Sequence, residues 1–168
     1  MEELQKRKTT RLAGADYNKD GAVFLTICTK DRRCILGHLV GTGVPDGPGI
    51  ELTKYGQIAE KYIHQLSDFY KNLSVEDYVI MPNHIHIMLR IQDEENGQGT
   101  PASTVQNSIP ARFVSTFKRF CNKEYGKNIW QYRSFDHIIR NREDYEEHIK
   151  YIYNNPAHWY YDKLYTEE

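Results

Sequence analysis

The segment that most constrains the fold is residues 81–91, MPNHIHIMLRI, because its residue types alternate. Successive side chains of a β-strand point to opposite faces of the sheet, so one face receives four aliphatic residues and the other receives His84 and His86. The aliphatic residues are Ile85, Ile87, Leu89 and Ile91. The pattern predicts a strand with one buried face and two neighbouring imidazoles on the opposite face.

Three more strands and three helices are predicted around this segment. A buried apolar run follows the turn signal NKDG, and the tight Pro82-Asn83 turn joins the two central strands. Apolar residues that recur every three or four positions predict the helices. We expect strands over 22–28, 73–81, 84–91 and 134–139, and helices over 52–69, 108–126 and 141–156.

The order of these elements predicts the fold class. Strand, helix, strand, strand, helix and strand in succession is the order of the split βαβ, or ferredoxin-like, fold. We therefore expect an α+β protein with an antiparallel sheet and helices on one face. The other face is expected to be free for a site, and the last helix is an extra C-terminal one.

Several residues mark the ends and the buried faces of the helices. Ser108 followed by Pro110 is a helix start, Gly126 is a stop, and Asn141 caps the last helix. The residues expected to face the core are Tyr55, Ile58, Tyr62, Leu66 and Phe69 in the first helix, and Phe113, Phe117, Phe120 and Cys121 in the second.

The composition excludes several classes of protein. A chain of 168 residues with 39% hydrophobic and 27% charged residues fits one globular domain, expected over residues 1–168. No apolar run approaches the ~18 residues that a membrane span needs, and MEELQKRKTTRL lacks the apolar core of a secretory signal. Three cysteines without a CxxC pair indicate reduced thiols. We expect a cytoplasmic protein, in a bacterial-type cytosol or nucleoid, with no membrane partner.

Three segments show no helical or strand periodicity. Residues 41–49, GTGVPDGPG, are expected to form a loop, and residues 92–108 a mobile loop. Residues 157–168 are expected to form an exposed C-terminal tail after Pro156.

The two histidines of the central strand are a candidate metal-binding pair. Two imidazoles placed two positions apart on a rigid strand can bind one divalent ion together. The alternative is that His84 and His86 are two solvated histidines on an open face.

The last helix carries the next candidate residues. With 3.6 residues per turn, His148, Tyr151 and Asn155 share one face, whereas Ile149 and Ile152 share the face suited to the core. A tyrosine four residues before a carbonyl-bearing side chain suits a metal held by two histidines. The alternative is that Tyr151 is a packing residue and Asn155 a C-terminal cap.

Residues 112–133 form a basic cluster in a chain whose formal net charge is −1. They include six basic residues and one acidic residue, so six minus one gives +5. Such a cluster can follow the phosphates of a nucleic acid, and neighbouring Trp130 and Tyr132 can stack on bases. The candidates for phosphate contacts are Arg112, Lys118, Arg119, Lys123 and Arg133. The alternative is a solvated helix face.

Three stretches of the chain resemble the motifs of a known family. MPNHIHIML resembles an HUH strand, in which two histidines flank one hydrophobic residue. WQYRSFDHIIRNREDYEEHIKYIYNNP resembles the family's strand and tyrosine helix with a YIxxNP ending, and RLAGADYNKDGAVFLTICTKDRRCILG its first strand. Over about residues 10–156 the chain therefore resembles the REP-associated tyrosine transposases, a branch of the single-tyrosine HUH endonuclease transposases.

The resemblance implies a role for particular residues. His84 and His86 match the family's metal ligands, Asn155 matches the third ligand and Tyr151 matches the nucleophile. His137 and His148 are candidates for residues that orient these groups, although His137 can equally be a structural histidine. Mg²⁺ or Mn²⁺ is the implied cofactor, and zinc is compatible with the ligand types.

The implied function is cleavage and transfer of DNA strands. The implied partner is single-stranded or hairpin DNA, which Tyr151 would cleave by forming a covalent 5′-phosphotyrosine. The tyrosine helix would serve its own subunit or, in a homodimer, that of its neighbour. Two alternatives fit the same residues: a non-catalytic protein that binds DNA hairpins, and a metal-dependent hydrolase in which His84, His86 and a third ligand such as His148 activate water. After Asn155-Pro156 the chain continues with AHWYYDKLY, which departs from the family pattern and leaves substrate specificity open.

Overall fold

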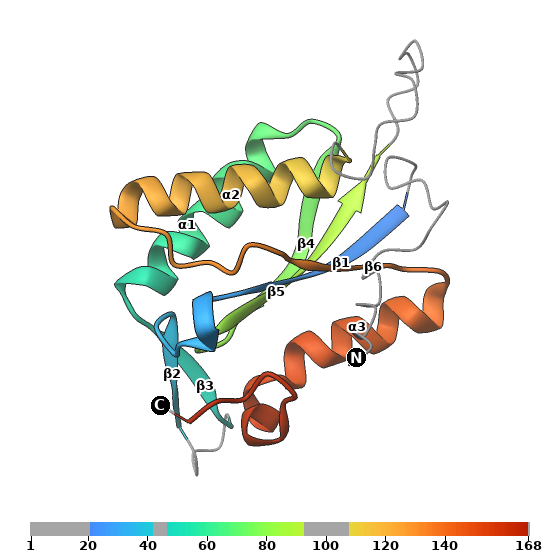
Figure 1. Cartoon of the computed structure of the whole chain (residues 1–168). Coiled ribbons are helices and arrows are strands. Elements are labelled where there is room, and N and C mark those ends of the chain that lie inside the picture. Colours follow the sequence, from blue (N-terminus) through green and yellow to red (C-terminus); the bar gives the residue numbers. More distant parts are fainter. Residues whose placement is uncertain (1–20, 42–46, 93–107, 168) are drawn as a thin grey trace, which may run out of the picture.

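The structure is a computed structural model, and it describes residues 21–41, 47–92 and 108–167. A four-stranded sheet lies between two layers of helices (Figure 1). Its elements are, in chain order, β1 (Gly21–Cys28), η1 (Lys30–Arg32), β2 (Gly37–Val40), β3 (Gly49–Leu52), α1 (Lys54–Phe69), β4 (Leu73–Ile80), β5 (His84–Ile91), α2 (Ile109–Tyr125), β6 (Phe135–Ile138), α3 (Arg142–Asn154) and η3 (Pro156–Tyr161).

The sheet has the topology that the element order predicts. Its strands lie in the order β4-β5-β1-β6, and every neighbouring pair is antiparallel. Helices α1 and α2 cover one face, as expected (Figure 1). The other face is not free, because α3 lies against it and buries Ile152 with Phe24 and Met88. The ferredoxin-like fold is thus confirmed, with the extra helix occupying part of the face expected to be open.

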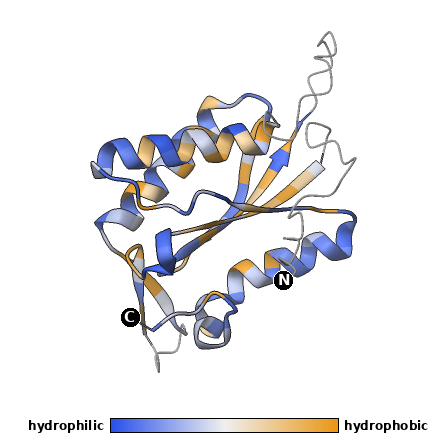
Figure 2. Ribbon diagram, viewed as in Figure 1, coloured by the Kyte–Doolittle hydropathy of each residue, from blue (hydrophilic) through white to orange (hydrophobic). Residues whose placement is uncertain are grey.

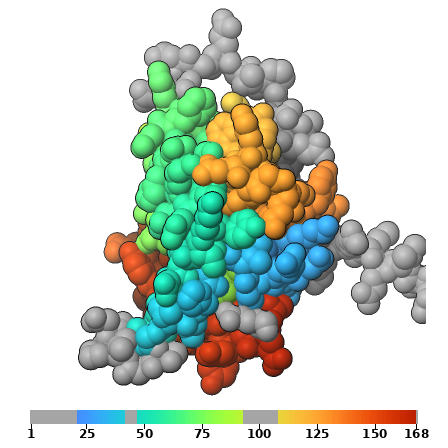
Figure 3. Space-filling model, turned by 90° about the vertical axis from the view of Figure 1, so that its left-hand side faces the viewer, coloured from blue at the N-terminus to red at the C-terminus, as the bar shows by residue number. Residues whose placement is uncertain are grey.

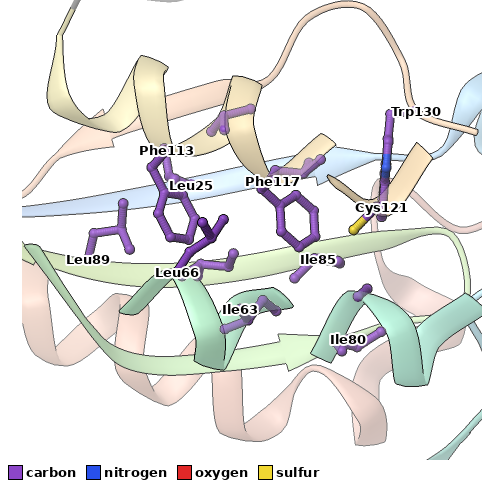
Figure 4. Close-up of a cluster of buried hydrophobic side chains, with 14 of the residues drawn as sticks. Leu25, Ile63, Leu66, Ile80, Ile85, Leu89, Phe113, Phe117, Cys121 and Trp130 are labelled. Carbon is purple, nitrogen blue, oxygen red and sulfur yellow. The ribbon is translucent and has the colours of Figure 1, made fainter. Parts of the chain in front are cut away.

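The main core lies between the sheet and the α1–α2 layer. All four aliphatic residues of β5 that the alternation assigned to this face are at most 1% exposed. Figure 4 shows Ile85 and Leu89 of this strand facing Phe113 and Phe117 of α2, and Figure 2 shows that β1 is mainly hydrophobic. One core prediction is wrong: Phe69, the last residue of α1, is 74% exposed and lies edge-on to Tyr70, whereas Leu66 of the same turn is 2% exposed.

The predicted helix ends are confirmed by their hydrogen bonds. The Ser108 side chain accepts from Ala111 N, and the Asn141 side chain accepts from Asp144 N at 2.8 Å. Gly126 has φ of 71°, the left-handed conformation that glycine adopts without a steric penalty. The helices therefore begin and end where capping chemistry places them.

A short hairpin that the sequence analysis did not predict precedes α1. Strands β2 and β3 pair antiparallel beyond the end of the main sheet. Gly56 of α1 lies so close to the carbonyl of Leu36, the residue before β2, that a Cβ atom would clash with it. The helix can therefore approach the chain at the start of the hairpin because residue 56 has no side chain. Of the expected loop over 41–49, residues 42–46 lie outside the described residues. Of the expected loop over 92–108, residues 93–107 do so.

The C-terminal segment, residues 156–166, is folded against the rest of the chain and is not an exposed tail. Trp159 of η3 is 2% exposed. The Asn83 side chain donates to the Leu164 carbonyl at 2.8 Å, and the Thr166 hydroxyl donates to the Arg32 carbonyl at 2.8 Å. Figure 3 shows this segment in red below the α1–α2 layer. In the described part of the chain, no helix combines the length and apolar character that crossing a membrane requires.

Candidate active site

His84 and His86 lie side by side on the face of the sheet that carries α3. They are 0% and 3% exposed, and their ring centroids are 4.5 Å apart. The Phe24 ring lies 5.0 Å from His86, and the Trp159 ring 5.9 Å from His84. The alternative of two solvated histidines is therefore wrong, because α3 and the C-terminal segment cover the face that carries them.

The side chain of Asn83 determines which nitrogen of His84 is free. Its Nδ2 group donates to the Leu164 carbonyl, so its Oδ1 atom accepts from His84 Nδ1 at 2.7 Å. Nδ1 therefore carries the proton, and Nε2 has a free lone pair. Nδ1 of His86 is hydrogen-bonded to the Thr26 hydroxyl at 2.9 Å, and this hydroxyl can donate to the ring or accept from it. A bond on one ring nitrogen orients an imidazole so that the other nitrogen can bind a metal.

Three buried atoms beside each other have no hydrogen-bond partner among the described residues. They are Nε2 of His84, Nε2 of His86 and Oδ1 of Asn155, which is 1% exposed. Buried polar atoms are normally paired, and each of these three atoms can accept through a lone pair. A cation is the group that satisfies a set of acceptors without donors. The donor set therefore fits the divalent ion that the sequence predicts.

Tyr151 presents its phenol to the same place. Its ring lies 5.1 Å from that of His86, and its side chain is 42% exposed, so both the imidazole pair and solvent reach it. Tyr153, two residues further along α3, is 69% exposed, and the Asp77 carboxylate of β4 raises its pKa. Helical geometry thus brings Tyr151, and not Tyr153, to the histidines.

The sequence analysis missed Asp162. Its Oδ2 atom accepts hydrogen bonds from the Tyr151 hydroxyl and from Asn155 Nδ2, both at 2.8 Å. One carboxylate oxygen of Asp162 and one ring nitrogen each of His84 and His86 all lie within 4.8 Å of one another. The residue follows η3 in a stretch without periodicity. The one available signal was an acid placed among the tyrosines of that stretch.

The pKa values at the site follow mainly from burial. Burial lowers the pKa of His84 to about 4 and that of His86 well below 6.5, so both rings are neutral at pH 7, the form that binds metals. Burial also raises the pKa of Tyr151, and the bond to Asp162 adds to this rise. Burial acts to raise the pKa of Asp162, but hydrogen bonds from Leu164 N, Asn155 and Tyr151 together lower it. The phenol is therefore protonated and the carboxylate ionised.

His137 and His148 lie in a second group with Asp144. Nε2 of His137 lies 2.9 Å from the Asp144 carboxylate, and Nδ1 of His148 donates to the Asp144 carbonyl at 2.8 Å. Their rings stack with centroids 4.7 Å apart. The Phe24 ring contacts both His148, at 4.6 Å, and His86, at 5.0 Å. His148 therefore belongs to a separate cluster with His137 and Asp144, and the Phe24 ring lies in contact with both this cluster and the imidazole pair.

The basic residues separate into two kinds. Nζ of Lys118 donates to the carbonyl of Gln131 at 2.7 Å and reaches those of the next two residues, and burial lowers its pKa to about 8. Its ammonium thus holds the loop before β6 in place. The exposed basic candidates are Arg112, Arg119, Lys123 and Arg133. The first three lie on α2, which covers the face opposite the site, and Arg133 lies in the loop that leads to β6.

The aromatic candidates for base stacking differ as well. Trp130 is 2% exposed and packs on Phe117, so it belongs to the core and is not available to a base. Tyr132 is 97% exposed beside Arg133. The prediction for Trp130 is therefore wrong, since its ring fills the space between α2 and the sheet.

No family model matches the chain, but curated proteins do. It is 27% identical to an uncharacterised protein of Haemophilus influenzae, with 98% of this chain and 96% of that protein aligned. It is 26% identical to a REP-associated tyrosine transposase of Escherichia coli, with 84% of this chain and 69% of that protein aligned.

A solved structure also resembles the chain. It is a REP-associated tyrosine transposase bound to a REP hairpin, with a TM-score of 0.60 and 24% identity over 94% of this chain and 73% of that one. This likeness shows a shared fold.

Proposed function

The chain is related to the REP-associated tyrosine transposases, and we propose that it cleaves and rejoins single-stranded DNA next to a hairpin. The single observation that carries the proposal is the arrangement of one solvent-accessible phenol beside three buried acceptor atoms without partners. A phenol alone is a poor nucleophile at neutral pH. A phenol beside a cation site in a transposase-like fold has what strand transfer requires.

The proposed reaction has one covalent step and its reverse. The Tyr151 oxygen would form a bond to the scissile phosphorus as the bond from phosphorus to the 3′ oxygen breaks. The products would be a phosphotyrosine at the 5′ end and a 3′ hydroxyl, whose oxygen takes up a proton from water. The phenol proton has an acceptor in contact, the Asp162 carboxylate at 2.8 Å. The bond energy is kept in the phosphotyrosine, so a second 3′ hydroxyl can rejoin the strand without ATP.

His84, His86 and Asn155 would hold the ion, because their free atoms are the ones that lack partners. When bound, a divalent ion would supply positive charge to the phosphate and to the ionising phenol. Tyr151 and the imidazole pair come from the same chain, so the proposed reaction needs no residue from a second copy.

Substrate binding would involve both sides of the sheet. The structural neighbour is bound to a REP hairpin, and a hairpin is the substrate we propose here. The exposed cations of α2 lie on the opposite face from Tyr151, whereas Arg133 and Tyr132 lie by the β6 edge. We propose that the DNA passes around this edge, with phosphates near Arg133 and an unpaired base on Tyr132.

The test is formation of a covalent adduct. The protein is incubated with labelled single-stranded hairpin DNA and Mn²⁺, denatured, and separated by gel electrophoresis. We expect an adduct with the wild type and with the matched control Tyr153→Phe, two residues further along α3, and none with Tyr151→Phe or His84→Ala. An adduct that persists in Tyr151→Phe overturns the proposal. Hairpin binding without an adduct in the wild type would favour the non-catalytic DNA-binding alternative.

A further inference from the structure

We infer that Asp162 is a fourth ligand of the ion that His84, His86 and Asn155 are proposed to hold. The inference rests on the proposed function and extends it to the C-terminal segment. The predicted site contained two imidazoles and one amide, all neutral. Asp162 is the one charged side chain among the four proposed ligands.

The first argument is distance. One carboxylate oxygen of Asp162 and one ring nitrogen of each histidine lie within 4.8 Å of one another. Ligand atoms about 2.2 Å from a shared ion are separated by about 3.1 Å when adjacent and about 4.4 Å when opposite. The three atoms therefore need only a small movement to bind one ion together.

The second argument is the position of Asn155. Its Nδ2 group donates to Asp162 Oδ2 at 2.8 Å, and its Oδ1 atom is buried without a partner among the described residues. The amide thus lies with its nitrogen toward the carboxylate. This bond ties Asp162 to a residue already assigned to the ion by its unpartnered oxygen.

The third argument is charge. The unpartnered atoms of His84, His86 and Asn155 can each offer a lone pair, and the Asp162 carboxylate brings a negative charge to the same cluster. The Asp162 oxygens have donors, but the three unpartnered atoms beside them do not, and a cation placed among them would be attracted by all four side chains. A carboxylate also shifts the donor set toward the oxygen ligands that Mg²⁺ and Mn²⁺ prefer.

The carboxylate is held firmly enough to serve as a ligand. Its Oδ1 atom accepts from Leu164 N at 2.7 Å, and the Leu164 carbonyl accepts from the Asn83 side chain. The same Asn83 side chain orients His84. One hydrogen-bonded chain thus positions both an imidazole and the carboxylate.

The competing explanation is that Asp162 only accepts hydrogen bonds from Tyr151 and Asn155. Direct Mn²⁺ binding without DNA separates the two, measured by the loss of the free-ion electron paramagnetic resonance signal. The variants are Asp162→Asn, His84→Ala and the matched control Asp77→Asn. Asp77 is an acid on β4, near Tyr153 of α3, and it lies outside the cluster.

We expect Asp162→Asn to weaken Mn²⁺ binding at least about tenfold, and Asp77→Asn to leave it within about twofold. If Asp162→Asn binds Mn²⁺ like the wild type while His84→Ala does not, the inference is overturned and the proposed metal site stands. If the wild type binds no Mn²⁺, or His84→Ala binds it equally well, the metal site of the proposed function fails too. Circular dichroism checks that each variant is folded. Should Asp162→Asn not fold, Asp162→Glu replaces it. A displaced carboxylate should then weaken binding more than threefold, and unchanged binding overturns the inference.

Discussion

The buried imidazole of His84 should make the stability of the protein fall between pH 8 and pH 5. Burial holds its pKa at about 4 in the folded chain, whereas an unfolded histidine has a pKa of about 6.5. Between these values the unfolded chain binds the proton more strongly, so acid favours unfolding. The stability that neutral His84 permits is complete above pH ~6.5 and is lost as pH falls toward 4.

The size of this loss follows from the two pKa values. At pH 5 an unfolded imidazole is almost fully protonated, and the folded one is protonated in about a tenth of the molecules. The unfolded chain thus binds more protons than the folded chain over this range. Integrated from pH 8 to pH 5, this difference lowers the free energy of unfolding by about 2 kcal/mol. His86 is shifted in the same direction by burial and adds to the loss.

The assay is urea unfolding at 25 °C, with chelator present, at pH 8 and at pH 5. The variants are His84→Gln, which cannot titrate, and His38→Gln, which removes an exposed imidazole on β2. We expect the wild type and His38→Gln to lose about 2 kcal/mol more than His84→Gln over this range. Equal losses in the wild type and His84→Gln would refute the reasoning, since the imidazole would then not be buried in its neutral form.

Three further predictions concern the ion, the loop before β6 and the C-terminal segment. Mn²⁺ at about 100 times its dissociation constant should add about 2.7 kcal/mol and raise Tm by ~5–10 °C, and His84→Ala should show no rise in differential scanning fluorimetry. Lys118→Met should destabilise the chain by about 1–3 kcal/mol, because three carbonyls lose their donor, yet leave the salt dependence of DNA binding unchanged. Arg119→Gln should instead lower the slope of log K against log salt concentration by about one, the value for one lost phosphate contact. Equal slopes in Lys118→Met and Arg119→Gln would contradict the division of the basic residues into two kinds. Trp159→Ala should cost about 3–5 kcal/mol in urea unfolding and speed proteolysis of the C-terminal segment; resistance equal to that of the wild type would show that the ring is not an anchor.

Local patterns were enough to predict the sheet and the position of two groups of the site. The alternation around His84 and His86 requires only that a strand has two faces, and the core buries the aliphatic one. Tyr151 and Asn155 are four residues apart on a helix, so their common direction follows from 3.6 residues per turn. These relations involve residues close in the chain, and tertiary contacts did not change them.

Relations between distant segments could not be predicted in the same way. Asp162 reaches the site because the chain turns back after Pro156, and no periodicity encodes that turn. The pairing of β2 with β3 depends on two strands of four residues each, too short to show a pattern. The charge of Lys118 indicated a surface residue, but its long side chain reaches three carbonyls inside the fold.

Asn83 has a consequence for how this protein can change over evolution. A single amide gives its oxygen to the His84 imidazole and its nitrogen to the Leu164 carbonyl in the C-terminal segment. Aspartate at position 83 would repel the Leu164 carbonyl. Leucine at this position would leave Nδ1 of His84 without its hydrogen bond. Substitutions at Asn83 and in the C-terminal segment, residues 156–166, should therefore be tolerated mainly in compensating pairs, so the turn between β4 and β5 and this segment should be inherited together.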